Sequence, residues 1–350
     1  MTVMLTAIMK SVECIDGATP YGRNDMIRMS ETAQLENVVT SEDTVVVKPA
    51  ATWDLMTNEL KAMIVDHLDI VSRNNMKWTS TNNLALVSFV PLRLTDFTIH
   101  EGSLSCDDRD GITIDMDDLS VKTRQKYWQL YWGEELKNGR KVYLPNGMKQ
   151  YSPLYLLEQW LTRFLLTTDI RVENFRADYD PPAELIDVDY RIQVSRIYFK
   201  SRDSDPRRIT RWINLCTDGL KALEICRGSG VLRGIGWNPK IINCQKLSIE
   251  RENGINNEQM INFKATQLKL IDSCITVRGV RRMIQKWIQE DYPVDSKFEC
   301  DLKNMEMVID GLDYQRLEAA DPEVRIQMRN GKQLIMERNR YSLEFYVENI

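Results

Sequence analysis

The spacing of apolar residues changes along this chain, and each spacing predicts a different structure. From residue 52 apolar residues fall at 60, 63, 64 and 68, which is one helical stripe. From about residue 151, short apolar strands alternate with helical stripes. After residue 325 apolar residues occupy every second position, at 326 and 328, 334 and 336, and 343, 345 and 347. This pattern predicts an antiparallel meander. We divide the chain into 1–51, 52–92, 93–150 and 151–350.

The segment 52–92 predicts three short helices. The first runs through Trp53–Leu68, the second carries Met76 and Trp78, and the third runs past Leu84 to Val87. The polar run Thr79–Thr81 can cap the third helix, and Pro91 ends it. So small a helical set is unstable unless it packs against something. Its apolar stripe therefore needs a second surface, either a partner or the rest of this chain.

The segment 151–350 predicts a repeating unit of strand and helix. A helical stripe at 154–165 leads into a strand at 170–175, and further strands are centred on Ile197, Leu223, Leu247, Leu268 and Phe298. Their spacing is uneven, roughly 20–30 residues, which is typical of an irregular leucine-rich-repeat solenoid. The meander, with a turn at Asn330-Gly331, would close the open edge of that solenoid. The predicted fold class is therefore α/β (α+β), with a short helical motif followed by a leucine-rich-repeat-like domain.

The two remaining segments are less regular. Residues 1–51 are rich in polar residues around one β-like run, Thr44–Lys48, and we expect a poorly ordered leader. Residues 93–150 predict a connecting segment with strands at 98–100 and 111–116 and an aromatic helix at Tyr127–Trp132. Those aromatic residues fit a buried helix face, although they also suit an interaction hot spot.

The composition of the chain argues against several classes of function. The net charge of −5 argues against general nucleic-acid binding, which needs a basic surplus on one face. No apolar run is long enough to span a membrane. Seven scattered cysteines without a secretory signal predict reduced thiols and an intracellular protein, cytoplasmic or nuclear. Only two histidines, His67 and His100, are present. We therefore expect no catalytic residues, no metal and no cofactor, with a metal held by carboxylates alone as the alternative that stays open.

Three motifs have a chemical alternative. The loop Gly228–Gly234 follows a strand and imitates a dinucleotide fingerprint, so a nucleotide-binding enzyme stays open. That fingerprint needs a helix directly after the glycines, and Gly236 and Pro239 disfavour one. The acidic run of Asp108, Asp110, Gly111 and Asp117 partly matches a calcium loop but starts at Cys106, so we read it as a solvated turn. Carboxylate pairs such as Asp187 with Asp189 and Glu318 with Asp321 have no accompanying nucleophile.

The segment 53–87 resembles an F-box, of the divergent kind found in large nematode families with an FTH or F-box-associated C-terminal domain. The residues that carry the resemblance are Trp53, Leu55, Glu59-Leu60, Ile64, His67-Leu68-Asp69, Ser72-Arg73 and the polar stretch Lys77–Asn83. In the C-terminal half, Leu215–Ile225 and Thr276–Ile288 are similar to units of those domains. One departure is clear, since Leu55-Met56-Thr57 stands where an F-box usually opens with Leu-Pro, and the fixed helix start of proline is lost.

The resemblance implies a substrate-recognition subunit of a Skp–cullin–F-box ubiquitin ligase. The helices would bind a Skp-type adaptor and thereby the cullin core, and the C-terminal domain would select an unknown protein substrate. The expected adaptor-binding residues are Trp53, Leu55, Leu60, Met63, Ile64 and Leu68. The alternatives are a non-ligase scaffold of leucine-rich-repeat type, in which these helices cap their own domain, and the nucleotide-binding enzyme.

Overall fold

The computed structural model describes residues 53–350 apart from short gaps, which are 69, 78, 102–111, 118, 125–128, 133–139, 144–152, 188–190, 200–204, 227, 229, 303–304, 311, 313–315, 321–322, 329–330 and 340–341. The chain forms two compact units, Met1–Val90 and Pro91–Ile350. The leader expected at 1–51 and its β-like run lie outside the described residues.

The first unit contains the three predicted helices. They are α2 (Asn58–Asp66), α3 (Ile70–Lys77) and α4 (Thr81–Phe89), preceded by the 3-10 turn η1 (Trp53–Leu55). Ser80 caps α4 as predicted, because its Oγ accepts a hydrogen bond from Asn83 N at 3.1 Å. The helix ends two residues before Pro91. A small buried cluster of Val65, Val87 and Val90 forms the core of this unit, and Ile70 of α3 is buried as well.

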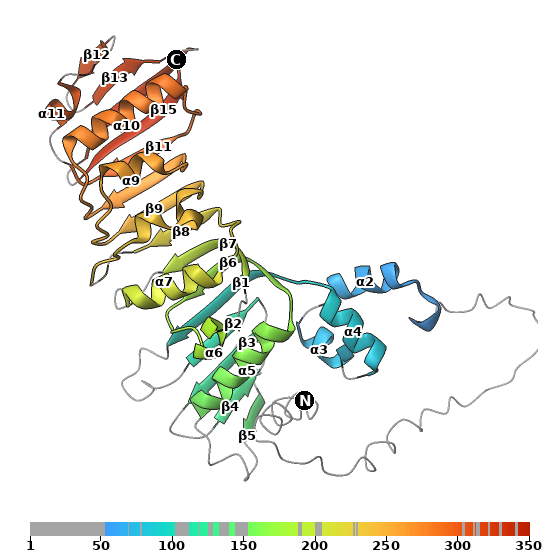
Figure 1. Ribbon diagram of the computed structural model, residues 1–350. Helices are drawn as coiled ribbons and strands as arrows, with labels where there is room; N and C mark the ends of the chain where they lie inside the picture. Colours follow the sequence, from blue (N-terminus) through green and yellow to red (C-terminus); the bar gives the residue numbers. More distant parts are fainter. Residues whose placement is uncertain are drawn as a thin grey trace, which may run out of the picture. The chain divides into compact units, whose positions relative to one another are not determined.

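The second unit is mixed α/β, built on one mixed sheet of fifteen strands in the order β12-β13-β14-β15-β11-β10-β9-β8-β7-β6-β1-β2-β3-β4-β5 (Figure 1). The strands are β1 (Leu92–Glu101), β2 (Ile112–Met116), β3 (Leu119–Arg124), β4 (Gln129–Trp132), β5 (Arg140–Tyr143), β6 (Ile170–Ala177), β7 (Gln193–Phe199), β8 (Ala222–Ile225), β9 (Lys246–Glu250), β10 (Gln267–Ile271), β11 (Lys297–Cys300), β12 (Arg316–Ala320), β13 (Glu323–Gln327), β14 (Lys332–Arg338) and β15 (Leu343–Asn349).

Helices and turns connect the strands and lie on one face of the sheet (Figure 1). They are α5 (Pro153–Thr167), α6 (Ala183–Asp187), α7 (Pro206–Leu215), η4 (Ile235–Trp237), α8 (Pro239–Ile242), α9 (Asn257–Asn262), α10 (Val277–Glu290) and α11 (Met305–Ile309). From β6 to β11 each strand pairs in parallel with the next strand in the sequence. A parallel connection needs a crossover of this kind, which is why a helix or turn follows each of these strands.

One buried row of side chains runs across the sheet in register, on the face that the helices cover. It consists of Met116, Phe97, Phe175, Ile197, Leu223, Leu247, Leu268, Phe298, Phe345, Met336 and Val324. Because side chains alternate between faces with a period of two, the residues between them point to the open face. The row explains the apolar centres that the sequence repeats.

The prediction for 93–150 is wrong in two respects. Gln129–Trp132 is the strand β4, paired with β3 and β5, and not part of an aromatic helix. Tyr and Trp favour strands as readily as a helix face, and cross-strand pairing decided between the two. The segment is also no mere connector, because β1 pairs in parallel with β6 and so places residues 92–143 in the same sheet. The side chains of β4 lie outside the described residues.

The C-terminal meander is present as predicted. Strands β13, β14 and β15 are antiparallel, and Gly331 at the turn has φ +70°. Strand β15 pairs antiparallel with β11, closing the edge of the last parallel strand. An additional strand, β12, which the alternation after residue 325 did not reveal, extends the meander.

Candidate functional site

Helix α2 has two apolar faces. Ala62 and Val65 point into the small core of the first unit. Leu60, Met63 and Ile64 lie at i, i+3 and i+4 on the outer face, where they are 51%, 61% and 39% exposed. A helix that needs only one buried stripe therefore carries a second one, and this outer stripe is an uncovered apolar surface.

The turn η1 exposes one more apolar side chain, N-terminal to this stripe. Leu55 is 77% exposed, whereas Trp53 packs on the core of the unit. The Lys61 ammonium lies 5.8 Å from the centre of the Trp53 ring, a cation–π contact that helps to hold the turn against α2. Of the six residues expected to bind an adaptor, Leu55, Leu60, Met63 and Ile64 are exposed. Trp53 and Leu68 instead pack against the core.

Thr57 supplies the helix start that a proline would otherwise fix. It is the N-cap of α2, in extended conformation, and its Oγ1 accepts a hydrogen bond from Leu60 N at 3.4 Å. A backbone hydrogen bond and the Thr57 hydroxyl lower the pKa of Glu59 in the first turn. A carboxylate there is favoured by the helix dipole. The departure from the Leu-Pro pattern thus leaves α2 with a capped start.

Arg73 holds the helix ends of the first unit together from inside. Its side chain is 4% exposed, with Nε 3.2 Å from Leu68 O and Nη1 3.0 Å from Val90 O. Nη2 also lies 3.8 Å from the Asp66 carboxylate. A buried guanidinium gives its donors to the carbonyls that a helix end leaves unpaired. Arg73 belongs to the stretch that resembles an F-box, but the sequence pattern did not reveal this role.

Helix α4 carries two further exposed apolar residues in the same unit. Leu84 is 46% exposed and Phe89 is 82% exposed. A helix that is apolar on more than one side is normally buried by neighbouring structure. The helical unit thus has more apolar surface than its own core covers.

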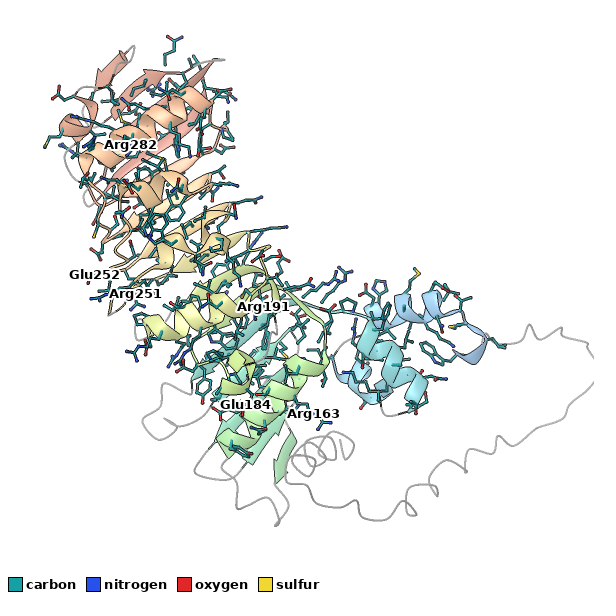
Figure 2. The ribbon with its side chains drawn as sticks, viewed as in Figure 1. Arg163, Glu184, Arg191, Arg251, Glu252 and Arg282 are labelled. Carbon is teal, nitrogen blue, oxygen red and sulfur yellow. The ribbon has the colours of Figure 1, made fainter. Side chains whose placement is uncertain are left out.

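The glycine loop is organised by a buried arginine of its own chain. Arg251 follows β9 (Figure 2) and is 1% exposed. Its Nε and Nη2 lie 3.3 and 3.2 Å from Gly230 O. Burial lowers the pKa of this guanidinium, and the charge of Asp205 opposes that effect. Gly230 has φ +81°, which favours glycine. A simple repeat loop accounts for these glycines.

A helix does follow the loop, contrary to the expectation that glycines and proline would prevent one, but it is short. The turn η4 leads into α8, which has four residues. Its first turn is already capped, because Asn238 Oδ1 accepts a hydrogen bond from Lys240 N at 3.0 Å. Such a helix gives little dipole to a pyrophosphate, so the nucleotide alternative gains no support from this geometry.

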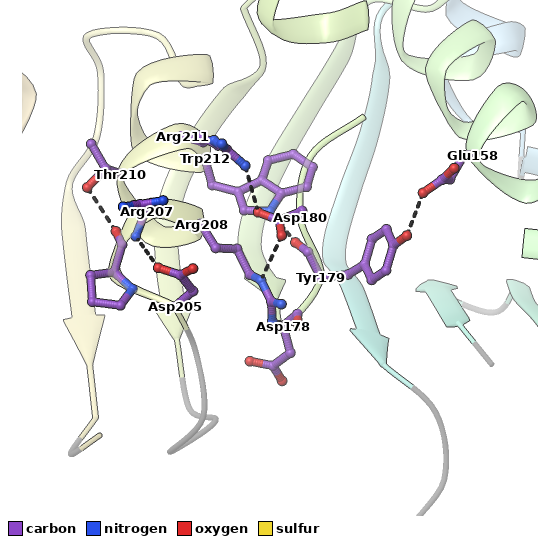
Figure 3. A network of polar contacts seen from close by, with 11 residues as sticks. Glu158, Asp178, Tyr179, Asp180, Asp205, Arg207, Arg208, Thr210, Arg211 and Trp212 are labelled. Carbon is purple, nitrogen blue, oxygen red and sulfur yellow. Dashed lines mark hydrogen bonds and ion pairs between the residues drawn. The ribbon is translucent and has the colours of Figure 1, made fainter. Parts of the chain in front are cut away.

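A polar network closes the carboxyl end of β6 (Figure 3). Trp212 Nε1 donates to Tyr179 O at 2.6 Å, and the Tyr179 hydroxyl donates to Glu158 Oε1 at 2.5 Å. Asp180 lies between two arginines of α7, with Arg211 Nη1 at 3.3 Å and Arg208 Nε at 3.7 Å. These contacts link α5 and α7 to the segment that follows β6.

Tryptophans within the helical stripes mostly form core, as the pattern predicts. Trp212 and Trp287 are 0% and 1% exposed. Trp160 is half-buried and stacks on Phe164 with ring centres 5.2 Å apart.

The open face of the sheet is charged. Lys246 and Lys269 reach glutamates of neighbouring strands, with Nζ 2.6 Å from Glu224 Oε1 and 2.8 Å from Glu250 Oε1 respectively. Lys269 also lies 3.4 Å from Glu299. Burial disfavours the charge on Lys269, but its contacts with the two glutamates outweigh that effect and raise its pKa. This face is therefore largely paired within itself.

Four glutamates of adjacent strands stand opposite one another at the C-terminal end of this face. In register they are Glu299, Glu344, Glu337 and Glu323, which we call the glutamate row. Lys297 Nζ lies 2.5 Å from Glu344, and the Tyr346 hydroxyl donates to Glu337 at 2.6 Å. Burial, the bond to Glu337 and the nearby carboxylates raise the pKa of Tyr346. Like charges directly opposite each other cost stability.

The part of the chain that the structure describes offers little support for a metal site. Asp108, Asp110 and most of the acidic run lie outside it. The carboxylate of Asp117 is used within the fold, accepting from the backbone N of Thr95 and of Asp96 at 3.0 and 2.8 Å. Within the described ranges no three His, Cys, Asp or Glu side chains group as metal ligands. No helix there combines the length and apolar character needed to cross a bilayer.

A scan against protein-family models finds no match, and searches of curated proteins and of solved structures find none either.

Proposed function

We propose that this chain is a non-catalytic substrate-recognition subunit of a Skp–cullin–F-box ubiquitin ligase. The observation that carries the proposal is the exposed stripe Leu60, Met63 and Ile64 on α2, opposite the face that builds the core. The resemblance of 53–87 to an F-box implies a Skp-type adaptor as the partner. Leu55 on η1 lengthens the contact.

The energetics favour a partner over solvent. Burying a Leu, Ile or Met side chain is worth about 1.5–3 kcal/mol. Four such residues, Leu55, Leu60, Met63 and Ile64, gather in 55–64, and an adaptor that covered them would gain several kilocalories per mole before the cost of association. The small core around Val65, Val87 and Val90 leaves them exposed.

The C-terminal unit would select the substrate as a leucine-rich-repeat-like domain. Neighbouring parallel strands in sequence order support this assignment. So does Asn253, which is 1% exposed after β9. Its Nδ2 donates to Arg251 O and Ile271 O at 2.9 and 3.1 Å, and its Oδ1 accepts from Ile255 N at 2.9 Å. An asparagine that joins successive loops is a feature of such repeats. The open strand or loop face of residues 170–310 would read the substrate.

The test is a pull-down of the full chain with a Skp-type adaptor, comparing wild type with Leu60→Asp/Ile64→Asp. Carboxylates on the docking stripe would be buried without partners, so we expect binding to be lost. Leu166→Asp/Ile186→Asp is the matched control, because these residues are 43% and 47% exposed on the other unit. The control should bind like wild type, and circular dichroism should show all three proteins folded.

The other outcomes separate the alternatives. A folded wild type that fails to capture the adaptor would contradict the ligase proposal and favour a leucine-rich-repeat scaffold whose helices cap their own domain. If both double variants lose adaptor binding equally, the adaptor recognises exposed apolar residues in general and not the stripe on α2. A nucleotide-dependent rise in the melting temperature would favour the enzyme alternative, since a ligand that binds only the native state stabilises it.

A further inference from the structure

Asn83 joins three parts of the helical unit through its side chain and backbone. Its Oδ1 accepts from Trp53 Nε1 at 3.0 Å, and its Nδ2 donates to Thr79 Oγ1 at 2.7 Å. Its backbone N donates to the Ser80 cap at 3.1 Å. Thr79 Oγ1 in turn donates to Met76 O at 2.8 Å. One residue of α4 thus connects η1 with the end of α3.

The bond to Trp53 spans thirty residues of sequence and is the polar contact that the structure records between η1 and α4. An indole N–H that packs against a core needs such an acceptor. Because η1 is a single 3-10 turn, fixing Trp53 also fixes the direction of Leu55, two residues later. Leu55 is the most exposed of the expected adaptor contacts.

We infer that Asn83 is a positioning residue for adaptor docking: it contacts no partner itself but holds the Trp53 turn so that Leu55 continues the stripe of α2. This inference rests on the proposed function. It also explains how the docking turn is fixed without the usual proline. Thr57 starts the helix, and Asn83 anchors the residues before it.

Asn83→Ala in the full chain tests the inference with two measurements. Hydrogen exchange of peptides covering 53–60 should quicken, because η1 loses its anchor, while exchange across the C-terminal sheet should not change. Adaptor affinity should fall about fivefold, the loss expected for one hydrogen bond. Asn82→Ala is the matched control, since Asn82 is an exposed neighbour on the same helix, and it should behave as wild type in both measurements.

Asn83→Asp separates positioning from simple destabilisation. Its carboxylate still accepts from the Trp53 indole, so adaptor affinity should return to near wild type although the donor to Thr79 is lost. Unchanged exchange at 53–60, or undiminished affinity of Asn83→Ala, would overturn the inference while leaving the ligase proposal standing. A wild type that binds no adaptor would overturn both the inference and the ligase proposal. The titration of the wild type with adaptor therefore shows which of the two has failed.

Discussion

At the scale of single residues, Gly279 in α10 sits where no larger residue fits. A Cβ there would lie 2.0 Å from Asn257 Oδ1 and 2.9 Å from Asn257 Cβ. Asn257 cannot easily move away, because it accepts from Thr276 N and donates to Thr276 Oγ1, both at 2.9 Å. Alanine normally gains about 0.5–1 kcal/mol over glycine within a helix. Overpacking costs about 1–3 kcal/mol, so Gly279→Ala should destabilise the protein by about 1–2 kcal/mol.

Urea denaturation of the full chain measures that loss, with Gly219→Ala as the control. Nothing lies within 4 Å of a Cβ built at Gly219, so this variant should stay within about 0.5 kcal/mol of wild type. A stabilised Gly279→Ala would mean that α9 and α10 shift apart at little cost.

Residue patterns predicted the exposed apolar stripe of α2 but not the residues that support it. Leu60, Met63 and Ile64 follow from helical periodicity, because spacing alone places them on one face. Periodicity does not say which of two apolar faces turns inward, so Trp53 and Leu68 were expected on the docking surface and pack on the core instead. Arg73 and Asn83 act through hydrogen bonds to distant residues, which one sequence does not reveal.

At the scale of elements, the glutamate row sets like charges opposite one another across four strands, and cations reach three of its members, Glu299, Glu344 and Glu323. Replacing Glu337 with Gln keeps an oxygen to accept the Tyr346 hydroxyl and removes one negative charge from the row. Glu337→Gln should therefore stabilise the protein by about 0.5 kcal/mol. Lys297→Gln should do the opposite, because Lys297 lies 2.5 Å from Glu344.

Urea denaturation at low and high salt checks both signs. The two effects should shrink together as salt screens charges at this partly exposed face. If Glu337→Gln destabilises the protein at low salt, the charge of Glu337 strengthens the hydrogen bond from Tyr346 by more than repulsion within the glutamate row costs.

Elements were predictable where a short-range pattern decides them. The strand predicted around Leu268 is present as β10, Gln267–Ile271, because its alternating apolar positions are a short-range signal. The segment at 127–132 was not, because its aromatic residues satisfy a helical spacing as well as a strand. Only pairing with β3 and β5, whose partner residues lie 5 to 14 positions away, decides for β4.

At the scale of the whole molecule, the stability should fall in alkali. Burial raises the pKa of the Cys216, Cys244 and Cys300 thiols to about 12, whereas an unfolded thiol titrates near pH 8.5. The folded protein therefore holds protons that the unfolded chain releases. The stability from these thiols is fully present below about pH 8.5 and is lost as pH rises toward 12, by up to about 1.4 kcal/mol per pH unit for each thiol.

Urea denaturation in reductant at pH 7 and pH 10 measures this loss. A Cys216→Ala/Cys244→Ala/Cys300→Ala variant is less stable at pH 7 but should lose less on going to pH 10. Equal losses in the variant and the wild type would assign the alkaline sensitivity to tyrosines and lysines.

The broad architecture was predictable, whereas its connectivity was not. The repeated apolar centres predicted that strands and helices alternate from β6 to β11. The apolar residues at every second position predicted the C-terminal meander. The parallel pairing of β1 with β6 joins residues more than seventy positions apart. Such contacts depend on which strand edges meet in space. The strands within 92–143 therefore belong to the same sheet, where we expected a separate connecting segment.

The pairing of β11 with β15 has a consequence for synthesis on the ribosome. Each strand from β6 to β10 meets its next neighbour as soon as one short crossover has emerged, but β11 meets β15 only after residues 301–342 have followed. At about 5–20 residues per second, that edge stays open for seconds in the nascent chain. An unpaired edge is a template for another chain, so translation pauses within 301–342 would be the moments when a chaperone matters most.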